Sequence, residues 1–178
     1  MILSEKFYQL KETESGHLTA IQNGISLHCL ENPLLEAKKY IETLPFKKGE
    51  KKVLVFGVGL GYHLREIFLK YKNQGTQDFL IMAIGPKDES FRDYLSLYYE
   101  RSLHLKLLVS NSPEEIFFNK EFVDFYLSDP LICLWRPCLL AQKNFFEKVM
   151  SYKALRKKTY SSSLEKILEE LKKKEWEL

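Results

Sequence analysis

Residues 53–67, VLVFGVGLGYHLREI, join four consecutive apolar residues to a helix-like segment through three alternate glycines. An uninterrupted apolar run, bounded by lysines and a glycine, predicts a strand that is buried on both faces, as in a parallel sheet. Gly57, Gly59 and Gly61 remove side chains from the turn that follows and permit backbone conformations that other residues rarely adopt. The segment therefore predicts a strand, a tight turn and a helix in succession.

Further apolar runs alternate with amphipathic segments along the chain. We expect strands at 53–56, 78–84, 104–110 and 131–135, and helices at 31–44, 61–72, 86–100, 113–119 and 138–158. Before them, apolar and polar residues alternate on both sides of Asn23-Gly24, a dipeptide that favours a tight hairpin. Strands that alternate with helices predict a mainly parallel sheet with right-handed crossovers. The predicted fold class is α/β, Rossmann-like and methyltransferase-like, with about four parallel strands, an N-terminal β-hairpin and a C-terminal helix.

The 178 residues suffice for one domain with its own core. We expect a hairpin region at 1–30 packed on a Rossmann-like α/β domain at 31–158, and an amphipathic helix at 159–178. Within this last part, the stretch SSSLEKILEELKKKEWEL begins with a serine cap and carries an apolar stripe. The stripe can fold back on the domain, pair with a second copy or dock a separate partner. Helix 161–176 is therefore a candidate surface for a protein partner or for self-association.

Composition narrows the classes of partner. The 27 Lys and Arg are interleaved with 24 Asp and Glu, so the sequence shows no basic stripe, and we expect no nucleic acid. No apolar window approaches a membrane span, and MILSEKFYQLKE lacks the apolar core of a signal peptide, so we expect a cytoplasmic protein without a membrane partner. The three cysteines and four histidines have no metal-ligand spacing, so we expect no metal, buried free thiols and surface imidazoles.

The glycine turn is the best candidate for a binding site. In open α/β sheets, ligands bind beyond the carboxyl ends of the strands, where backbone amides at a helix start favour anions. The G-x-G-x-G spacing is closer to the first motif of S-adenosylmethionine-dependent methyltransferases than to the dinucleotide fingerprint. The alternative is that the glycines only allow a tight turn. The candidate residues for S-adenosylmethionine or a nucleotide are Gly57, Gly59, Gly61, Tyr62, His63 and Asp88.

The end of the next strand argues against an ordinary adenosine site. Gly85 stands where nucleotide-binding folds place an acid that holds the ribose hydroxyls. Asp88 lies just beyond and can replace that acid, or it can begin a helix whose dipole favours it. No catalytic residue is assigned: His63 is either a general base or a locally packed side chain, and Arg136 either meets an anion or forms a salt bridge.

Several stretches of the chain resemble a known family. The runs that carry the resemblance are LHCLENPLLEAKKYIETL, VLVFGVGLGYHLREIF, AIGPKDESF, KLLVSNSPEEI and LWRPCLLAQKNFFEKVM. They are similar to the N-terminal Rossmann-type domain of the motility-associated factor (Maf) glycosyltransferase-like proteins, over about residues 17–158, and GVGLGYH is the most specific segment.

The resemblance implies bacterial protein glycosylation, chiefly the attachment of nonulosonic acids to flagellin. It also implies that the activity belongs to a later, central domain, which these residues do not include. The family's acid at the end of the second strand is Gly85 here. By resemblance, the loop from Gly57 to His63 is a ligand-facing turn of an accessory or vestigial domain.

Two functions follow from the sequence. The first is a non-catalytic or accessory module that binds a ligand or partner in a flagellin or surface glycosylation system. The second is a small S-adenosylmethionine-dependent methyltransferase, because such an enzyme needs little beyond a bound methyl donor and a positioned nucleophile. If the turn is a ligand site, Gly59→Leu is expected to abolish binding and leave the fold intact.

Overall fold

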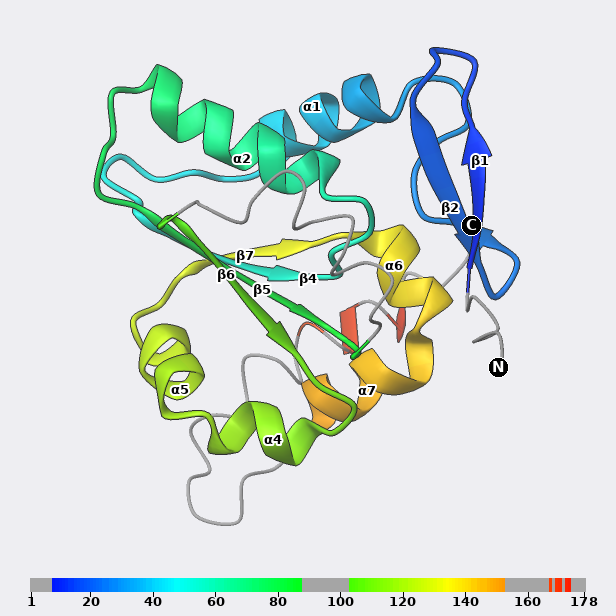
Figure 1. The fold of residues 1–178 in the computed structure, drawn as a ribbon. Coiled ribbons are helices and arrows are strands. Elements are labelled where there is room, and N and C mark those ends of the chain that lie inside the picture. Colours follow the sequence, from blue (N-terminus) through cyan, green and yellow to red (C-terminus); the bar gives the residue numbers. More distant parts are fainter. Residues whose placement is uncertain (1–7, 88–102, 153–166, 168, 171, 174–178) are drawn as a thin grey trace.

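The computed structural model describes residues 8–87, 103–152, 167, 169–170 and 172–173, which form two sheets and the helices around them (Figure 1). The main sheet is parallel, in the order β6-β5-β4-β7. Its strands are β4 (Lys52–Phe56), β5 (Leu80–Gly85), β6 (Leu105–Val109) and β7 (Leu131–Leu134). The predicted α/β class and the four parallel strands are confirmed. The chain moves outward from β4 to β6 and then returns to the other side of β4, so strand order reverses between β4 and β7.

The sheet is buried on both faces because alternate residues point to opposite sides. Leu54, Phe56, Met82 and Ile84 belong to the core with helices α4 (Pro113–Phe118), α5 (Lys120–Leu127) and α7 (Lys143–Ser151). Val53, Val55, Ile81 and Ala83 belong to the core with α1 (Pro33–Thr43) and α2 (Tyr62–Asn73). Figure 1 shows α1 and α2 on one face of the sheet and α4, α5 and α7 on the other.

The helices begin where the sequence places caps and prolines. Pro33 opens α1, and the Asn32 side chain accepts a hydrogen bond from the Leu35 amide at 3.0 Å. Ser112 and Pro113 begin α4 in the same way, and the Ser112 hydroxyl accepts from the Glu115 amide at 3.2 Å. The helices expected at 31–44, 61–72 and 113–119 are therefore confirmed within a few residues.

The N-terminal sheet is antiparallel and contains β1 (Gln9–Glu12), β2 (Leu18–Gln22) and β3 (Ile25–Ser26). Asn23 and Gly24 connect β2 to β3 with φ values of 50° and 78°, so the predicted hairpin turn is confirmed. Strand β1 was not predicted. All four of its residues are exposed, so they lack the alternation of apolar and polar residues that marks a half-buried strand.

The expected helix at 138–158 is wrong in two respects. It begins earlier, at Arg136, because Pro137 favours the first turn, and it ends at Ala141 as α6 (Arg136–Ala141). Gln142 leaves the helical conformation at φ −123° and ψ 35°, and α7 starts again at Lys143. Residues 120–127 form α5, for which no helix was predicted, with the Asn119 side chain as its cap.

Two predictions fall largely outside the described residues. Asp88 and nearly all of the helix expected at 86–100 lie there, as does most of helix 161–176. Of that terminal helix, Ile167 packs against the core beneath the sheet, and the Lys172 ammonium lies 3.9 Å from a Glu147 carboxylate oxygen on α7. These described residues thus contact the chain's own core. In the described part of the chain, no helix is both long enough and apolar enough to span a bilayer.

Candidate functional site

The glycine turn lies at the carboxyl end of β4, at the point where strand order reverses. Gly57, Gly59 and Gly61 all have positive φ values, of 89°, 50° and 80°, so each occupies a conformation that favours glycine. Every residue from 57 to 61 is buried. The turn is in the place that the sequence predicts for a ligand site of this fold, but protein surrounds it.

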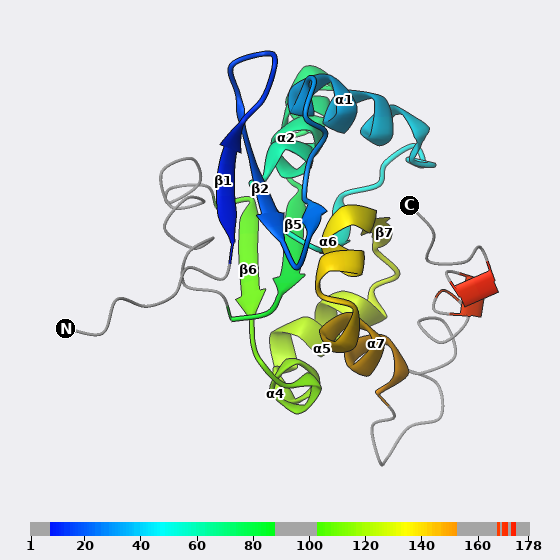
Figure 2. The ribbon, with the colours of Figure 1, turned by 90° about the vertical axis from the view of Figure 1, so that its right-hand side faces the viewer.

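The N-terminal sheet covers this end of the parallel sheet (Figures 1 and 2). Its side chains and backbone form hydrogen bonds with the turn, α6 and the residues beside them. The bonded pairs are Leu60 N with His28 Nε2, Tyr62 Oη with Leu18 O, Trp135 Nε1 with Leu27 O, Asn23 Nδ2 with Ala141 O, and Gln142 Nε2 with Gln22 Oε1, at 2.7–3.0 Å. The sheet is therefore attached to the α/β core at several points.

His28 is the residue of this cover that reaches the turn. Its buried Nε2 accepts the hydrogen bond of the Leu60 amide at 3.0 Å, so Nδ1 carries the proton of the neutral ring. The ring lies edge-on to Tyr62 at 4.9 Å and 5.2 Å from the Trp135 ring. Glu36 Oε2 is 3.9 Å from Nδ1, which is too long for a hydrogen bond. The His28 imidazole is thus packed between the Tyr62 and Trp135 rings and hydrogen-bonded to the Leu60 amide.

His63 is buried beside it, at the start of α2. Its Nε2 donates to the Gly57 carbonyl at 2.9 Å, and its ring stacks on Trp135 at 4.3 Å with the planes 1° apart. The expectation of surface imidazoles is therefore wrong for His28 and His63. Burial lowers the pKa of His63 to about 3, and burial together with the neighbouring His63 lowers the pKa of His28 well below 6.5. Both rings are neutral at physiological pH.

Three backbone amides of the turn, those of Gly57, Leu60 and Gly61, donate hydrogen bonds within the protein. The Gly57 amide donates to Ile84 O at 3.0 Å and the Gly61 amide to Val58 O at 3.0 Å. The Gly59 backbone lies beside the buried thiol of Cys138, since a Cβ at Gly59 would stand 3.2 Å from Cys138 Sγ, and burial raises the pKa of that thiol. With the Leu60 amide bonded to His28 Nε2, the amides of residues 57, 60 and 61 are satisfied without a ligand.

The glycines are also required by packing. A Cβ at Gly57 would stand 2.6 Å from Cys138 Cβ, and a Cβ at Gly59 would stand 2.7 Å from His28 Nε2. Real Cβ atoms do not approach other heavy atoms this closely, so something must move. The packing thus leads us to expect that Gly59→Leu disturbs the fold around His28 as well as any binding at the turn.

Gly59→Ala is expected to lower the free energy of unfolding by about 2 kcal/mol. The substitution forces an alanine into the left-handed backbone conformation and displaces the His28 ring. Gly75→Ala is the matched control, since Gly75 has a φ of 69° and no atom within 4 Å of the added Cβ. Urea denaturation of both variants measures the difference. Equal losses would show that the space beside Gly59 does not need to be empty.

The remaining predicted positions are not all brought together. Tyr62 is half-buried, and its hydroxyl donates to Leu18 O at 2.8 Å. Gly85 ends β5 at a buried position beside Val58 and offers no side chain to a ribose. Asp88 lies outside the described residues. Because three amides of the turn are bonded within the protein and Gly85 supplies no acid for a ribose, the described residues do not fit S-adenosylmethionine or a nucleotide in the usual way.

No local sequence pattern marks His28, Trp135 or Cys138 as neighbours of the turn, because they are distant from it in the chain. In the part of the chain that the structure describes, no three His, Cys, Asp or Glu side chains are arranged to hold a metal ion. Comparisons with models of protein families, with curated proteins and with solved structures found no match. The functional interpretation therefore depends on the contacts described above.

Proposed function

We propose that the chain is a non-catalytic accessory module with a Rossmann-like fold, which acts by binding a partner in a bacterial flagellin or surface glycosylation system. Its resemblance to the Maf N-terminal domain supports the setting. The family places its activity in a different domain, so a module of this kind serves by contact with other proteins rather than by chemistry of its own.

One observation carries the non-catalytic part of the proposal. His28 and Cys138 occupy the space beside the glycine turn, and His28 accepts the hydrogen bond of the Leu60 amide, so a ligand of the turn would have to displace them. The His28 ring accepts from a backbone amide between aromatic rings, as a bound heterocycle would. A side chain of the protein itself thus stands where a ligand of the turn would bind. This arrangement supports a structural role for the glycines.

Thermal unfolding of the purified protein tests this function. A ligand at a hundred times its dissociation constant adds about 2.7 kcal/mol, which raises the melting temperature of a domain this size by about 5–10 °C. We expect no such rise with millimolar S-adenosylhomocysteine or with a cytidine-activated sugar. A rise with S-adenosylhomocysteine, lost in Gly59→Ala, would contradict the proposal and favour the methyltransferase. A rise with the sugar nucleotide would make the turn a ligand site in glycosylation.

A further inference from the structure

A hollow runs between α1 and α2, on the outer side of the pair. It has a volume of about 590 Å³ and is lined by Lys38, Ile41 and Glu42 of α1 and by residues from Arg65 to Gln74 of α2. A second hollow, of about 490 Å³, lies beside the loop at Phe46–Lys51 and also contacts Gln74. The two hollows adjoin at Gln74, which lines both, and we call them together the α1–α2 groove.

Cations dominate the lining of the α1–α2 groove. Six of the residues that line it are basic and three are acidic: Lys38, Lys47, Lys48, Lys51, Arg65 and Lys70 against Glu42, Glu50 and Glu66. The acids do not neutralise all of them. Arg65 pairs with Glu66 at 2.7 Å, and Lys51 pairs with Asp78 at 2.9 Å.

Lys38, Lys47 and Lys48 are exposed and form no ion pair with another described residue. Lys70 lies over the Phe46 ring at 4.5 Å, so its ammonium is held at the groove wall. The groove thus presents several ammonium groups that are not paired with carboxylates of the described chain.

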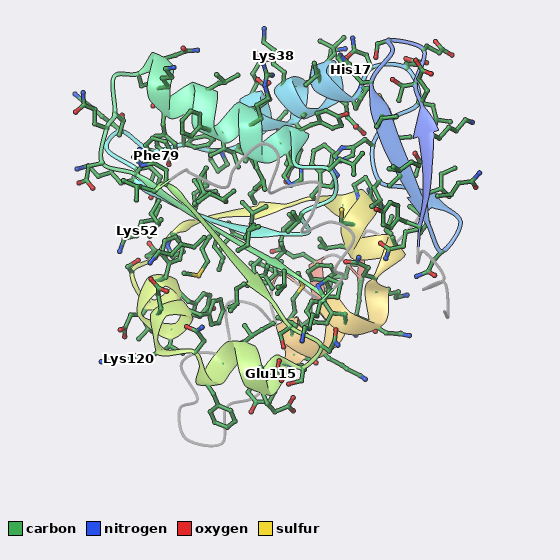
Figure 3. The ribbon with its side chains drawn as sticks, viewed as in Figure 1. His17, Lys38, Lys52, Phe79, Glu115 and Lys120 are labelled. Carbon is green, nitrogen blue, oxygen red and sulfur yellow. The ribbon has the colours of Figure 1, made fainter. Side chains whose placement is uncertain are left out.

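The segment that forms α4 and α5, on the opposite face of the sheet, has the opposite charge. Residues 36–78 contain nine Lys and Arg against five Asp and Glu, whereas residues 113–130 contain one lysine against five acids. Figure 3 shows Lys38 at the outer surface by α1 and α2, and Glu115 and Lys120 on the far side of the sheet. This uneven distribution of charge is not evident in the sequence, because basic and acidic residues occur along the whole chain. The fold separates them in space.

We propose that the α1–α2 groove is the docking surface for an acidic segment of a partner protein. The proposal rests on the proposed function and names the chemistry of its partner. The groove combines free ammonium groups with an apolar floor at Ile41 and Leu69, which suits a segment that carries carboxylates along one side and apolar groups along the other.

A protein segment fits this surface better than nucleic acid does. A phosphate backbone carries charge at every step, and Glu42, Glu50 and Glu66 would repel it at intervals along the groove. The Phe46 ring, which a base would need for stacking, lies under Lys70. A peptide can place its carboxylates beside the lysines and avoid the three acids.

Fluorescence anisotropy with a labelled, glutamate-rich amphipathic peptide of about 15 residues tests the proposal. The wild-type protein is expected to bind with a dissociation constant of about 1–100 μM, weakening in about 0.5 M NaCl. Lys38→Glu/Lys47→Glu/Lys48→Glu is expected to weaken binding by at least about tenfold. These positions are exposed, so circular dichroism and thermal unfolding should match the wild type.

The matched control is Lys11→Glu/Lys120→Glu/Lys148→Glu, which changes the net charge equally at exposed positions of β1, α5 and α7. It should keep wild-type affinity; a loss equal to that of the groove variant would overturn the proposal, as would the absence of peptide binding. Tighter binding of a single-stranded oligonucleotide to the groove would assign it to nucleic acid instead. Self-association that the groove variant abolishes would assign it to the acidic face of a second copy.

The failure of the groove is distinguishable from the failure of the proposed function. If the protein binds neither the peptide nor the two ligands of the thermal test, S-adenosylhomocysteine and the activated sugar, the groove proposal fails. The accessory function is then kept, and its partner surface lies elsewhere. A protein that is stabilised by S-adenosylhomocysteine contradicts the accessory function, whatever the peptide does.

Discussion

His28→Ala is expected to lower the free energy of unfolding by about 3–4 kcal/mol. The substitution removes a buried ring from between Tyr62 and Trp135 and leaves the Leu60 amide without an acceptor. The loss of packing and the unsatisfied donor act together, because the same ring provides both the contact and the hydrogen bond.

Free imidazole provides a direct check on this expectation. The cavity left by His28→Ala has the shape and the donor that an imidazole needs, so millimolar imidazole should raise the melting temperature of the variant more than that of the wild type. His17→Ala is the control, since His17 is half-buried on the same cover, 6.2 Å from the Tyr62 ring. A loss below about 1 kcal/mol, or equal effects of imidazole on all three proteins, would show that His28 is not the ligand of the turn.

Mild acid is expected to destabilise the protein through the two buried histidines. The pKa values of both rings are lower in the folded chain than the ordinary 6.5. Below pH 6.5, the unfolded chain therefore binds more protons at these two histidines than the folded chain does. Stability is then greatest above pH 6.5 and falls as the pH decreases. Between about pH 7.5 and 5.5, the free energy of unfolding should decrease by roughly 2–3 kcal/mol, with both rings contributing.

His63→Phe tests the assignment, because phenylalanine keeps the stack on Trp135 and cannot titrate. Over the same pH range, the variant should lose about half as much unfolding free energy as the wild type. Urea denaturation at each pH provides the measurement. Burial raises the pKa of Glu36, which opposes the effect nearer pH 4.5, so the comparison is made above that range. An unchanged loss in His63→Phe would mean that the folded chain accepts a proton on this ring.

Local patterns were sufficient to predict most of the fold. The apolar runs at Val53–Phe56 and Ile81–Ile84 are buried on both faces, and such strands have no polar residues to interrupt them. Asn23-Gly24 predicts its own turn because both residues tolerate positive φ. Strand β1 and the break at Gln142 were not predicted, because exposed residues and a single change of backbone direction leave no periodic pattern.

The position of the glycine turn could be predicted from the sequence, but the side chains that pack against it could not. The glycines at 57, 59 and 61 marked the turn correctly, because their conformations are local. The neighbours of the turn are set by tertiary contacts: His28 is 32 residues from Leu60, and Trp135 is 108 residues from Leu27. Neither contact changes the local pattern of the sequence, so a ligand and a side chain of the same chain could not be distinguished.

The cover formed by the N-terminal sheet has a consequence for the order of folding. Its hydrogen bonds to Trp135, Ala141 and Gln142 span between 108 and 120 residues. During synthesis the first strands leave the ribosome long before these partners exist, and closing so long a loop costs entropy that local contacts do not repay. The N-terminal strands are therefore made first, but their hydrogen bonds to the rest of the domain can form only after residues 135–142 have been made.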